Sequence, residues 1–259
     1  MEIDLGFVLA VLGAGFGAGF FATAIGAGSL VSFPILLGVG LPPLVANVSN
    51  TVGMVPGGVT GSWGFRRELE GENHLMVRVV ATSLVGGLAG SVLLLAMPPG
   101  AFSLAVPYLV IFAATLVGIQ PFVTRWLRRR NVRRGVVPSH RDTMGPVLTA
   151  ASSTVGVYGG YFGAGQGVML VAVLGLGLDV PLNVVNGLKN LAILCANLAA
   201  TVVFVFAAPL DWTAVLLVGI GSVVGGWAGA HVGRRLPPLL FRTLVVLFGY
   251  VFGVRLLLG

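Results

Sequence analysis

The amino-acid sequence predicts an all-α polytopic membrane protein built from two inverted repeats. Three observations predict this fold: a hydrophobic composition, long apolar segments, and motifs that recur in the second half. Of the 259 residues, 56% are hydrophobic and 9% are charged, and the mean hydropathy is +1.01. A soluble globular domain carries roughly 25% charged residues. The apolar content excludes a disordered chain, and the single cysteine excludes a disulfide scaffold.

Uninterrupted apolar segments account for most of the chain. An apolar helix needs about 20 residues to cross the bilayer core. Eight segments approach or exceed this length: 5–24, 43–65, 75–96, 103–126, 146–162, 182–207, 212–232 and 239–257. Two shorter apolar segments, 29–40 and 166–177, each follow a glycine-rich run. We therefore expect about eight full transmembrane helices and two short or broken helical segments.

The two halves of the sequence share a series of motifs. The run from Gly26 to Ser29 corresponds to the run from Gly163 to Gln166, at an offset of 137 residues. Later pairs hold an offset of 139: Asn47 with Asn186, Asn50 with Lys189, Thr51 with Asn190, and residues 83–90 with 222–229. The pattern indicates a duplication, with a first transmembrane repeat over 1–127, an arginine-rich loop over 128–143 and a second repeat over 144–259.

Basic residues at equivalent connections indicate that the repeats are inverted. Seven arginines lie within residues 125–141, and the pairs Arg66 with Arg67 and Arg234 with Arg235 each match an uncharged pair in the other half. Positive charge marks cytoplasmic connections, so equivalent loops face opposite sides and each half has an odd number of crossings. Counting the short segments gives five plus five crossings of the plasma (inner) membrane, with both termini outside and the arginine-rich loop cytoplasmic. The alternative, four plus four, would place Arg234 and Arg235 outside.

Polar residues within two apolar segments mark a candidate binding site. Lys189, the only lysine of the chain, shares a long apolar segment with Asn186, Asn190 and Asn197. At about 100° per residue, the three asparagines fall on one helix face with Lys189 beside them. An ionisable residue inside the membrane indicates a functional site, and a cation suits an anionic substrate. The alternatives are asparagines that join helices and a lysine that snorkels to the interface.

The glycine runs predict broken helices. Glycine costs about 1 kcal/mol relative to alanine inside a helix, so each run is expected to interrupt its span. A break frees backbone N–H groups, and the N-terminus of the next half-helix favours an anion. Two equivalent sets would form this cradle: Gly26, Gly28 and Ser29 in the first repeat, and Gly163, Gly165 and Gln166 in the second. Close packing of small residues is the alternative explanation of such runs.

Other kinds of site find little support in the sequence. The histidines lie in or near connections and form no metal-ligand cluster. The glycines of residues 13–18 superficially fit a dinucleotide fingerprint, but they lack its strand–turn–helix context. The basic residues border apolar spans, so nucleic-acid binding is not expected. We expect no cofactor, no bound metal and no catalytic residue.

On these motifs, the chain resembles the sulfite exporter TauE/SafE family of membrane permeases. The resemblance rests on residues 26–29 with Pro34 downstream, residues 47–51, residues 161–167 and residues 186–190, within a duplicated layout. It covers nearly the whole chain. The resemblance implies a plasma-membrane carrier, usually an exporter, for sulfite, organosulfonates or related sulfur-containing anions.

The residues and the resemblance together predict a secondary transporter of small oxyanions that works by alternating access. An anion channel, a membrane-embedded enzyme and an assembly subunit are the alternatives. The expected partners are a small anionic substrate and the lipid bilayer, and a homo-oligomer is left open. The predicted substrate site combines the glycine runs with the polar residues of both repeats: Gly26, Gly28, Ser29, Asn47, Asn50, Thr51, Gly163, Gly165, Gln166, Asn186, Lys189 and Asn190.

Overall fold

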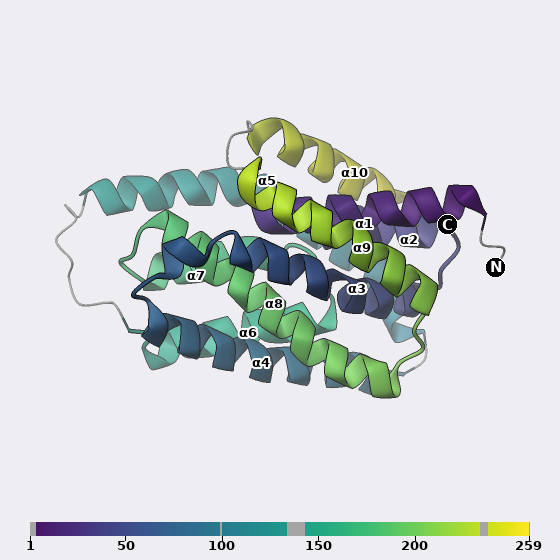
Figure 1. Ribbon diagram of the computed structural model, residues 1–259, viewed down its shortest axis with the longest axis horizontal. Helices are drawn as coiled ribbons and strands as arrows, with labels where there is room; N and C mark the ends of the chain where they lie inside the picture. Colours follow the sequence, from purple (N-terminus) through teal and green to yellow (C-terminus); the bar gives the residue numbers. More distant parts are fainter. Residues whose placement is uncertain (1–3, 99, 134–142, 234–237, 259) are drawn as a thin grey trace.

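The computed structural model describes residues 4–98, 100–133, 143–233 and 238–258, and every regular element in these ranges is helical (Figure 1). Most of the predicted arginine-rich loop, together with Arg234 and Arg235, lies outside the described residues. The helices are α1 (Leu5–Ile25), α2 (Ser29–Gly38), α3 (Pro43–Trp63), η1 (Arg66–Leu69, a 3-10 helix), α4 (Asn73–Ala96), α5 (Ala101–Arg133), α6 (Pro146–Tyr161), α7 (Gln166–Gly177), α8 (Leu182–Ala207), α9 (Trp212–His231) and α10 (Pro238–Leu258).

The predicted all-α polytopic fold is confirmed in the described ranges. Five helices are long and apolar enough to cross a membrane: α1, α4, α5 over its first 27 residues, α8 and α9. The two short apolar helices, α2 and α7, begin at Ser29 and Gln166, at the ends of the predicted breaks. The exact number of crossings stays a prediction.

Each glycine run ends one helix and reverses the chain into the next. Gly26 follows α1 with a φ of 77°, and Gly163 follows α6 with a φ of 75°. This left-handed backbone is open to glycine and strained for other residues. The two equivalent glycines therefore explain why both breaks occur where they do.

The reversals produce two helical hairpins. In the first hairpin (α1 and α2), Gly17 lies against Val31, so α2 returns along α1. In the second hairpin (α6 and α7), Gly177 lies against Leu148 near the open end. If α2 and α7 re-enter, each hairpin returns to the side from which it started, and the three remaining helices of that repeat make three crossings. Three and five are both odd numbers. The opposite orientation of the two halves therefore does not depend on whether α2 and α7 cross or re-enter.

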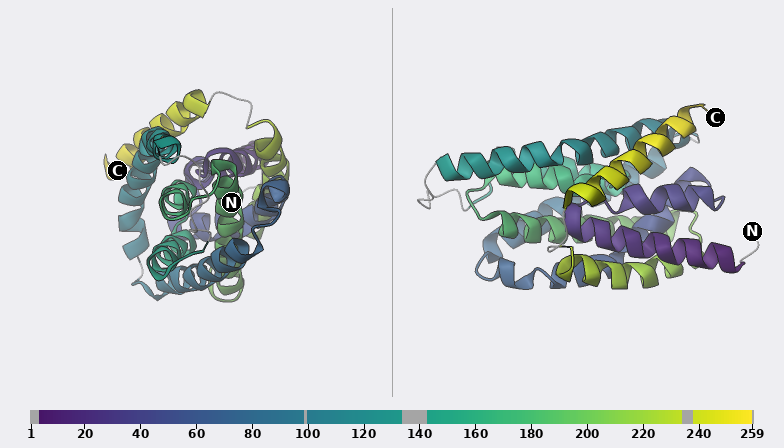
Figure 2. Two further views of the ribbon diagram at one scale, coloured as in Figure 1. Left: turned by 90° about the vertical axis from the view of Figure 1, so that its left-hand side faces the viewer. Right: turned by 90° about the horizontal axis from the view of Figure 1, so that it is seen from above.

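Equivalent helices of the two repeats run in opposite directions. Figures 1 and 2 show that α1 begins and α10 ends at one end of the molecule, whereas α5 runs towards the other end. The equivalent helices α3 and α8 pack against each other in opposite directions, with Gly58 against Leu194. The arrangement is the one expected of inverted repeats.

Each repeat contributes its fourth helix to the other repeat. α9 packs in parallel with α1 and α3, and α4 packs in parallel with α6 and α8. Glycines allow the close approach: Gly225 of α9 faces the Phe16 carbonyl of α1, and the equivalent Gly86 of α4 faces the Ser153 carbonyl of α6. We call α1, α2, α3 and α9 the first bundle, and α4, α6, α7 and α8 the second bundle. α5 and α10 pack together along the outside (Figure 2).

The carboxylates of the described ranges all lie outside the α-helices. Asp4 accepts a hydrogen bond from the Phe7 backbone N–H at 2.7 Å, and Asp211 accepts one from the Ala214 N–H at 2.8 Å. These N-caps pair the free N–H groups that begin α1 and α9. Acidic residues thus stabilise helix ends, and the described α-helices themselves carry no negative side chain.

Alanine at Gly225 or Gly86 should destabilise the protein, because the added methyl group would overlap a backbone carbonyl of the neighbouring helix. Overpacking costs about 1–3 kcal/mol. Gly13→Ala is the matched control, since no atom lies within 4 Å of its added carbon. Thermal unfolding in detergent should show lower melting temperatures for the first two variants only. Equal melting temperatures in all three would contradict the described packing.

Cysteine labelling tests the inverted orientation in a Cys195→Ala background. Arg66 and Val232 lie at the end towards which α5 runs, and Ala101 and Ala208 lie at the opposite end. Cysteines at the first two positions should react with an impermeant maleimide from the cytoplasmic side only. Cysteines at the other two should react from outside only. Labelling of Arg66→Cys and Val232→Cys from different sides would overturn the topology.

Candidate functional site

The tips of the two hairpins meet inside the protein. The backbone N–H of Gly167, in the first turn of α7, donates a hydrogen bond to the Gly26 carbonyl at 3.2 Å. A side chain at either glycine would collide with the other backbone, so glycine is required for this approach. The helices α2 and α7 thus begin close together. Their N-termini present backbone donors and the positive ends of two helix dipoles.

Lys189 reaches this meeting point from α8. Its side chain is 1% exposed, and its Nζ donates a hydrogen bond to the Thr23 carbonyl at 3.1 Å. Thr23 lies in the last turn of α1, three residues before Gly26. The C-terminal end of a helix carries partial negative charge, so an ammonium group is stabilised there. The lysine is therefore fully buried beside a hairpin tip and does not snorkel to an interface.

Three donors from different helices satisfy the free carbonyls at the end of α1. Lys189 pairs with Thr23, the Gln120 Nε2 of α5 donates to the Ile25 carbonyl at 3.2 Å, and Gly167 pairs with Gly26. Gln120 is 4% exposed. The sequence prediction missed Gln120, although a lone glutamine inside an apolar span was a usable signal.

Neutral groups hold the equivalent tip of the second hairpin. The Asn47 Nδ2 of α3 donates to the Tyr161 carbonyl at 3.0 Å, and the Tyr158 hydroxyl donates to the Ala164 carbonyl at 2.6 Å. Asn47 thus reaches across from the first repeat to the end of α6, as Lys189 reaches from the second repeat to the end of α1. Of the two cross-repeat contacts, only the one to the first hairpin carries a charge.

A second polar cluster lies at the start of α2. The Asn50 Nδ2 donates to the Ser29 Oγ at 3.3 Å and contacts the Met54 sulfur at 3.6 Å, and the Ser29 hydroxyl contacts the same sulfur at 3.6 Å. The Asn50 Oδ1 is buried and has no partner among the described residues. Thr51, by contrast, bonds to the Asn47 carbonyl of its own helix.

A small cavity lies between α1, α3 and α8, with three polar side chains in its lining. Its lining includes Thr23, Met54, Asn190 and Asn197, and its volume is about 20 Å³. The Asn190 Nδ2 is buried with no partner among the described residues. A cavity of this size holds about one water molecule. An oxyanion would enter only after the surrounding helices move apart, so the structure is closed at this point.

Besides Thr51 and Asn190, two further predicted residues do not join these clusters through a side-chain hydrogen bond. The Asn186 Nδ2 donates to the Leu182 carbonyl of its own helix at 2.9 Å, and its side chain is partly exposed. Gln166 is 1% exposed and packs over Gly159, with neither amide atom partnered among the described residues. The structure brings Ser29, Asn47, Asn50 and Lys189 into contacts at or near the tips, and the predicted site as a whole stays a prediction.

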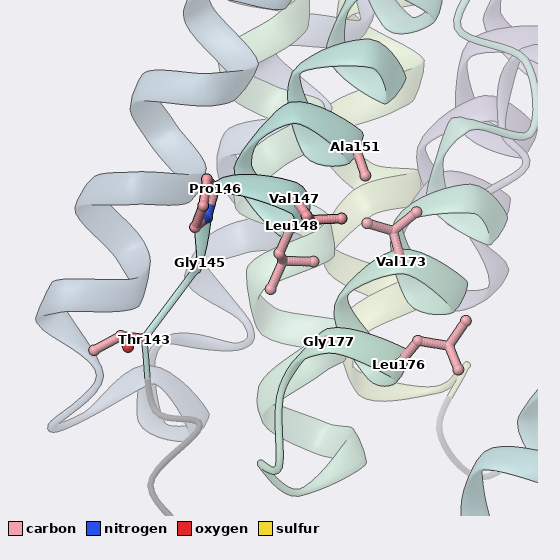
Figure 3. A pocket seen from close by; sticks show the side chains of 9 residues that line it. All are labelled: Thr143, Gly145, Pro146, Val147, Leu148, Ala151, Val173, Leu176 and Gly177. Carbon is pink, nitrogen blue, oxygen red and sulfur yellow. The ribbon is translucent and has the colours of Figure 1, made fainter.

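A larger cavity lies elsewhere, between the beginning of α6 and the end of α7 (Figure 3). It measures about 510 Å³, and hydrophobic side chains such as Val147, Leu148 and Leu176 point into it. Thr143 brings the one hydroxyl group among the lining residues, and none of them is charged. This cavity lacks the donors that an anion requires. Among the described residues, no group of three metal-ligating side chains occurs either.

The chain matches a known family over almost its whole length. The family described as "Sulfite exporter TauE/SafE" matches residues 11–256, which confirms the resemblance stated above. A "Probable membrane transporter protein ORF9" of Sinorhizobium sp is 26% identical, over 94% of this chain and 90% of the relative. A "Probable membrane transporter protein" of Haemophilus influenzae is 22% identical, over 99% and 96% respectively.

A third relative, the "Probable membrane transporter protein YfcA" of Escherichia coli K12, is 24% identical over 93% of this chain and 86% of the relative. No solved structure matches this chain.

Paired substitutions at the tips should change stability in opposite directions. Asn47→Leu should lower the melting temperature, because it leaves the Tyr161 carbonyl without its donor. Gln166→Met should raise it, since an unsatisfied buried amide costs about 1–3 kcal/mol. Thermal unfolding of both variants in one detergent measures the difference. A Gln166→Met variant that melts below the wild type would show that the amide has a stabilising partner.

Proposed function

Since the chain belongs to the sulfite exporter TauE/SafE family of membrane transporters, we propose that it exports small sulfur-containing oxyanions, such as sulfite or organosulfonates. Transport would cross the plasma membrane by alternating access. The arginine-rich loop would face the cytoplasm and both termini the outside. The observation that carries the proposal is the buried ammonium group of Lys189 at the junction of the two hairpins.

The charge balance of the helices favours an anionic substrate. The described α-helices contain no carboxylate that could neutralise Lys189 from within a span. A cation held in a low-dielectric interior is costly unless an opposite charge accompanies it. The half-helix N-termini at the tips add donors of the kind that bind oxyanions. An oxyanion bound beside Lys189 would supply the missing negative charge.

The packing indicates which parts would move. The division into two sequence repeats does not match the tightest contacts, because α9 packs with α1 and α4 packs with α6. The units that rock would therefore be the first and second bundles. Between them lie the contact of α3 with α8, the Lys189 bond to Thr23 and the Gly167 bond to Gly26. Opening the closed cavity on one side requires that these cross-bundle bonds be exchanged for substrate contacts.

The α-helices in the described ranges also limit the coupling mechanism. A conventional proton relay uses aspartate or glutamate within the membrane, and these helices contain none. Protons, if coupled, would have to move on Lys189 or on the substrate itself. In the first case, Lys189 would both bind the anion and carry the exchanged proton.

Lys189→Met should reduce sulfite flux in proteoliposomes at least about tenfold, because a charge-assisted contact to a buried anion contributes roughly 1.5–3 kcal/mol. Val202→Ala, at an exposed position of the same helix, is the matched control and should transport normally. Counterflow of labelled sulfite against unlabelled anion distinguishes a carrier from a channel. Full flux in Lys189→Met would contradict the assignment of Lys189 to the substrate site. Flux without counterflow would favour an anion channel over a carrier.

A further inference from the structure

A second cationic side chain lies on the inward face of α10. Arg242, Val245 and Gly249 are spaced i, i+3 and i+7, which places them on one face of the helix. Val245 is 2% exposed, and Gly249 lies against Ala114 of α5 and Leu30 of α2. The face that carries Arg242 is therefore the face that packs onto the first hairpin. An arginine that only contacted lipid headgroups would instead lie on the exposed face of α10.

The register of α10 against α5 places Arg242 at the depth of the hairpin tip. The two helices run in opposite directions, with Gly249 against Ala114 and Gly253 against Ile111. Continuing this pairing for two turns sets Arg242 level with residues 120–122 of α5. Gln120 bonds there to the Ile25 carbonyl at the end of α1. Figures 1 and 2 agree, because α10 begins level with the end of α1 along the molecule.

The Arg242 side chain is half-buried, and its Nε is buried without a partner among the described residues. The register of α10 and the Lys189 bond to Thr23 set the two cations at a similar depth, near the end of α1. Two like charges at one depth repel each other, and no carboxylate of the described α-helices offsets them. An unpartnered donor at the depth of a second buried cation is an arrangement that an anionic ligand would stabilise.

We propose that Arg242 is a second binding residue for the transported anion and that, with Lys189, it makes the site prefer dianions to monoanions of similar size. The inference rests on the proposed function, since it assigns a further residue to the same substrate site. The attraction between a fixed cation and a ligand doubles when the ligand carries two charges instead of one. Loss of Arg242 should therefore weaken dianion binding more than monoanion binding.

Sulfate and methanesulfonate are suitable probes, because they are similar in size and carry two charges and one charge. Each would compete with labelled sulfite for flux in proteoliposomes, and each would be titrated against the melting temperature of the purified protein. Arg242→Gln should lower the sulfate-to-methanesulfonate affinity ratio about tenfold. Arg242→Lys keeps the charge and should retain most of the preference. Arg255→Gln, on the exposed part of α10, should leave the ratio unchanged.

The outcomes separate the two proposals. If the wild type shows neither sulfite flux nor anion-dependent stabilisation, the proposed function fails. If the wild type shows both and Arg242→Gln keeps the wild-type ratio, the role of Arg242 alone is wrong. Should Arg242→Gln fail to fold, Arg242→Lys decides the matter. A lysine variant that folds, transports and has lost the dianion preference would contradict a role based on charge.

Discussion

The hydrogen bond from Lys189 to the Thr23 carbonyl satisfies a need created by the break in α1. A helix that ends inside the protein leaves its last carbonyls without intrahelical donors, and in a membrane region little water is present to replace them. A cation suits these carbonyls better than a neutral donor, because the end of the helix is itself partly negative. The same bond joins the first bundle to the second, so stability of the closed state and access to the ammonium group are linked.

The duplication and the packing divide the molecule in different ways. By sequence, α4 belongs with α1–α3, and α9 belongs with α6–α8. By contact, the two helices are exchanged, and glycines such as Gly86 and Gly225 make the exchanged pairs the tightest in the molecule. Each bundle therefore contains parts of both repeats. In the proposed transport cycle, a bundle of mixed origin would respond to substrate bound by either repeat, so both hairpins would take part in one conformational change.

The sequence predicted most of the elements and the position of both breaks. Apolar content and length located the helices, and the glycine runs located the breaks at Gly26 and Gly163, where the structure has left-handed backbone. The backbone carbonyl that Lys189 contacts could not be predicted, because every residue has a backbone carbonyl and the sequence does not show which one faces the lysine. The packing of α4 and α9 against the opposite repeats could not be predicted from the sequence for another reason. Glycine spacing shows that a close approach occurs, but it does not identify the partner helix.

Arg242 shows a third limit of sequence reasoning. It lies four residues after Pro238 at the start of an apolar segment, and in that position it has the pattern of an ordinary flanking charge. Only the packing of α10 on α5 and α2 turns that residue inward. Ser29 and Asn50, which form the cluster at the start of α2, were both predicted as site residues, and Asn50 matches Lys189 in the duplication. Its actual contacts with Ser29 and Met54 depend on how α3 crosses the hairpin.

The divergence of the two repeats is compatible with the single anion site proposed above for a symmetric scaffold. At the offset of 139, Lys189 matches Asn50 and Arg242 matches Ser103, so both cations belong to the second repeat. Lys189 nevertheless acts on the tip of the first hairpin, where Thr23 accepts its hydrogen bond. Had both repeats kept the cations, four positive charges would face one another across two touching tips, and their repulsion would oppose the closed state. Neutral residues in one repeat leave the hairpins free to meet, and the remaining charge is concentrated where the proposed anion would balance it.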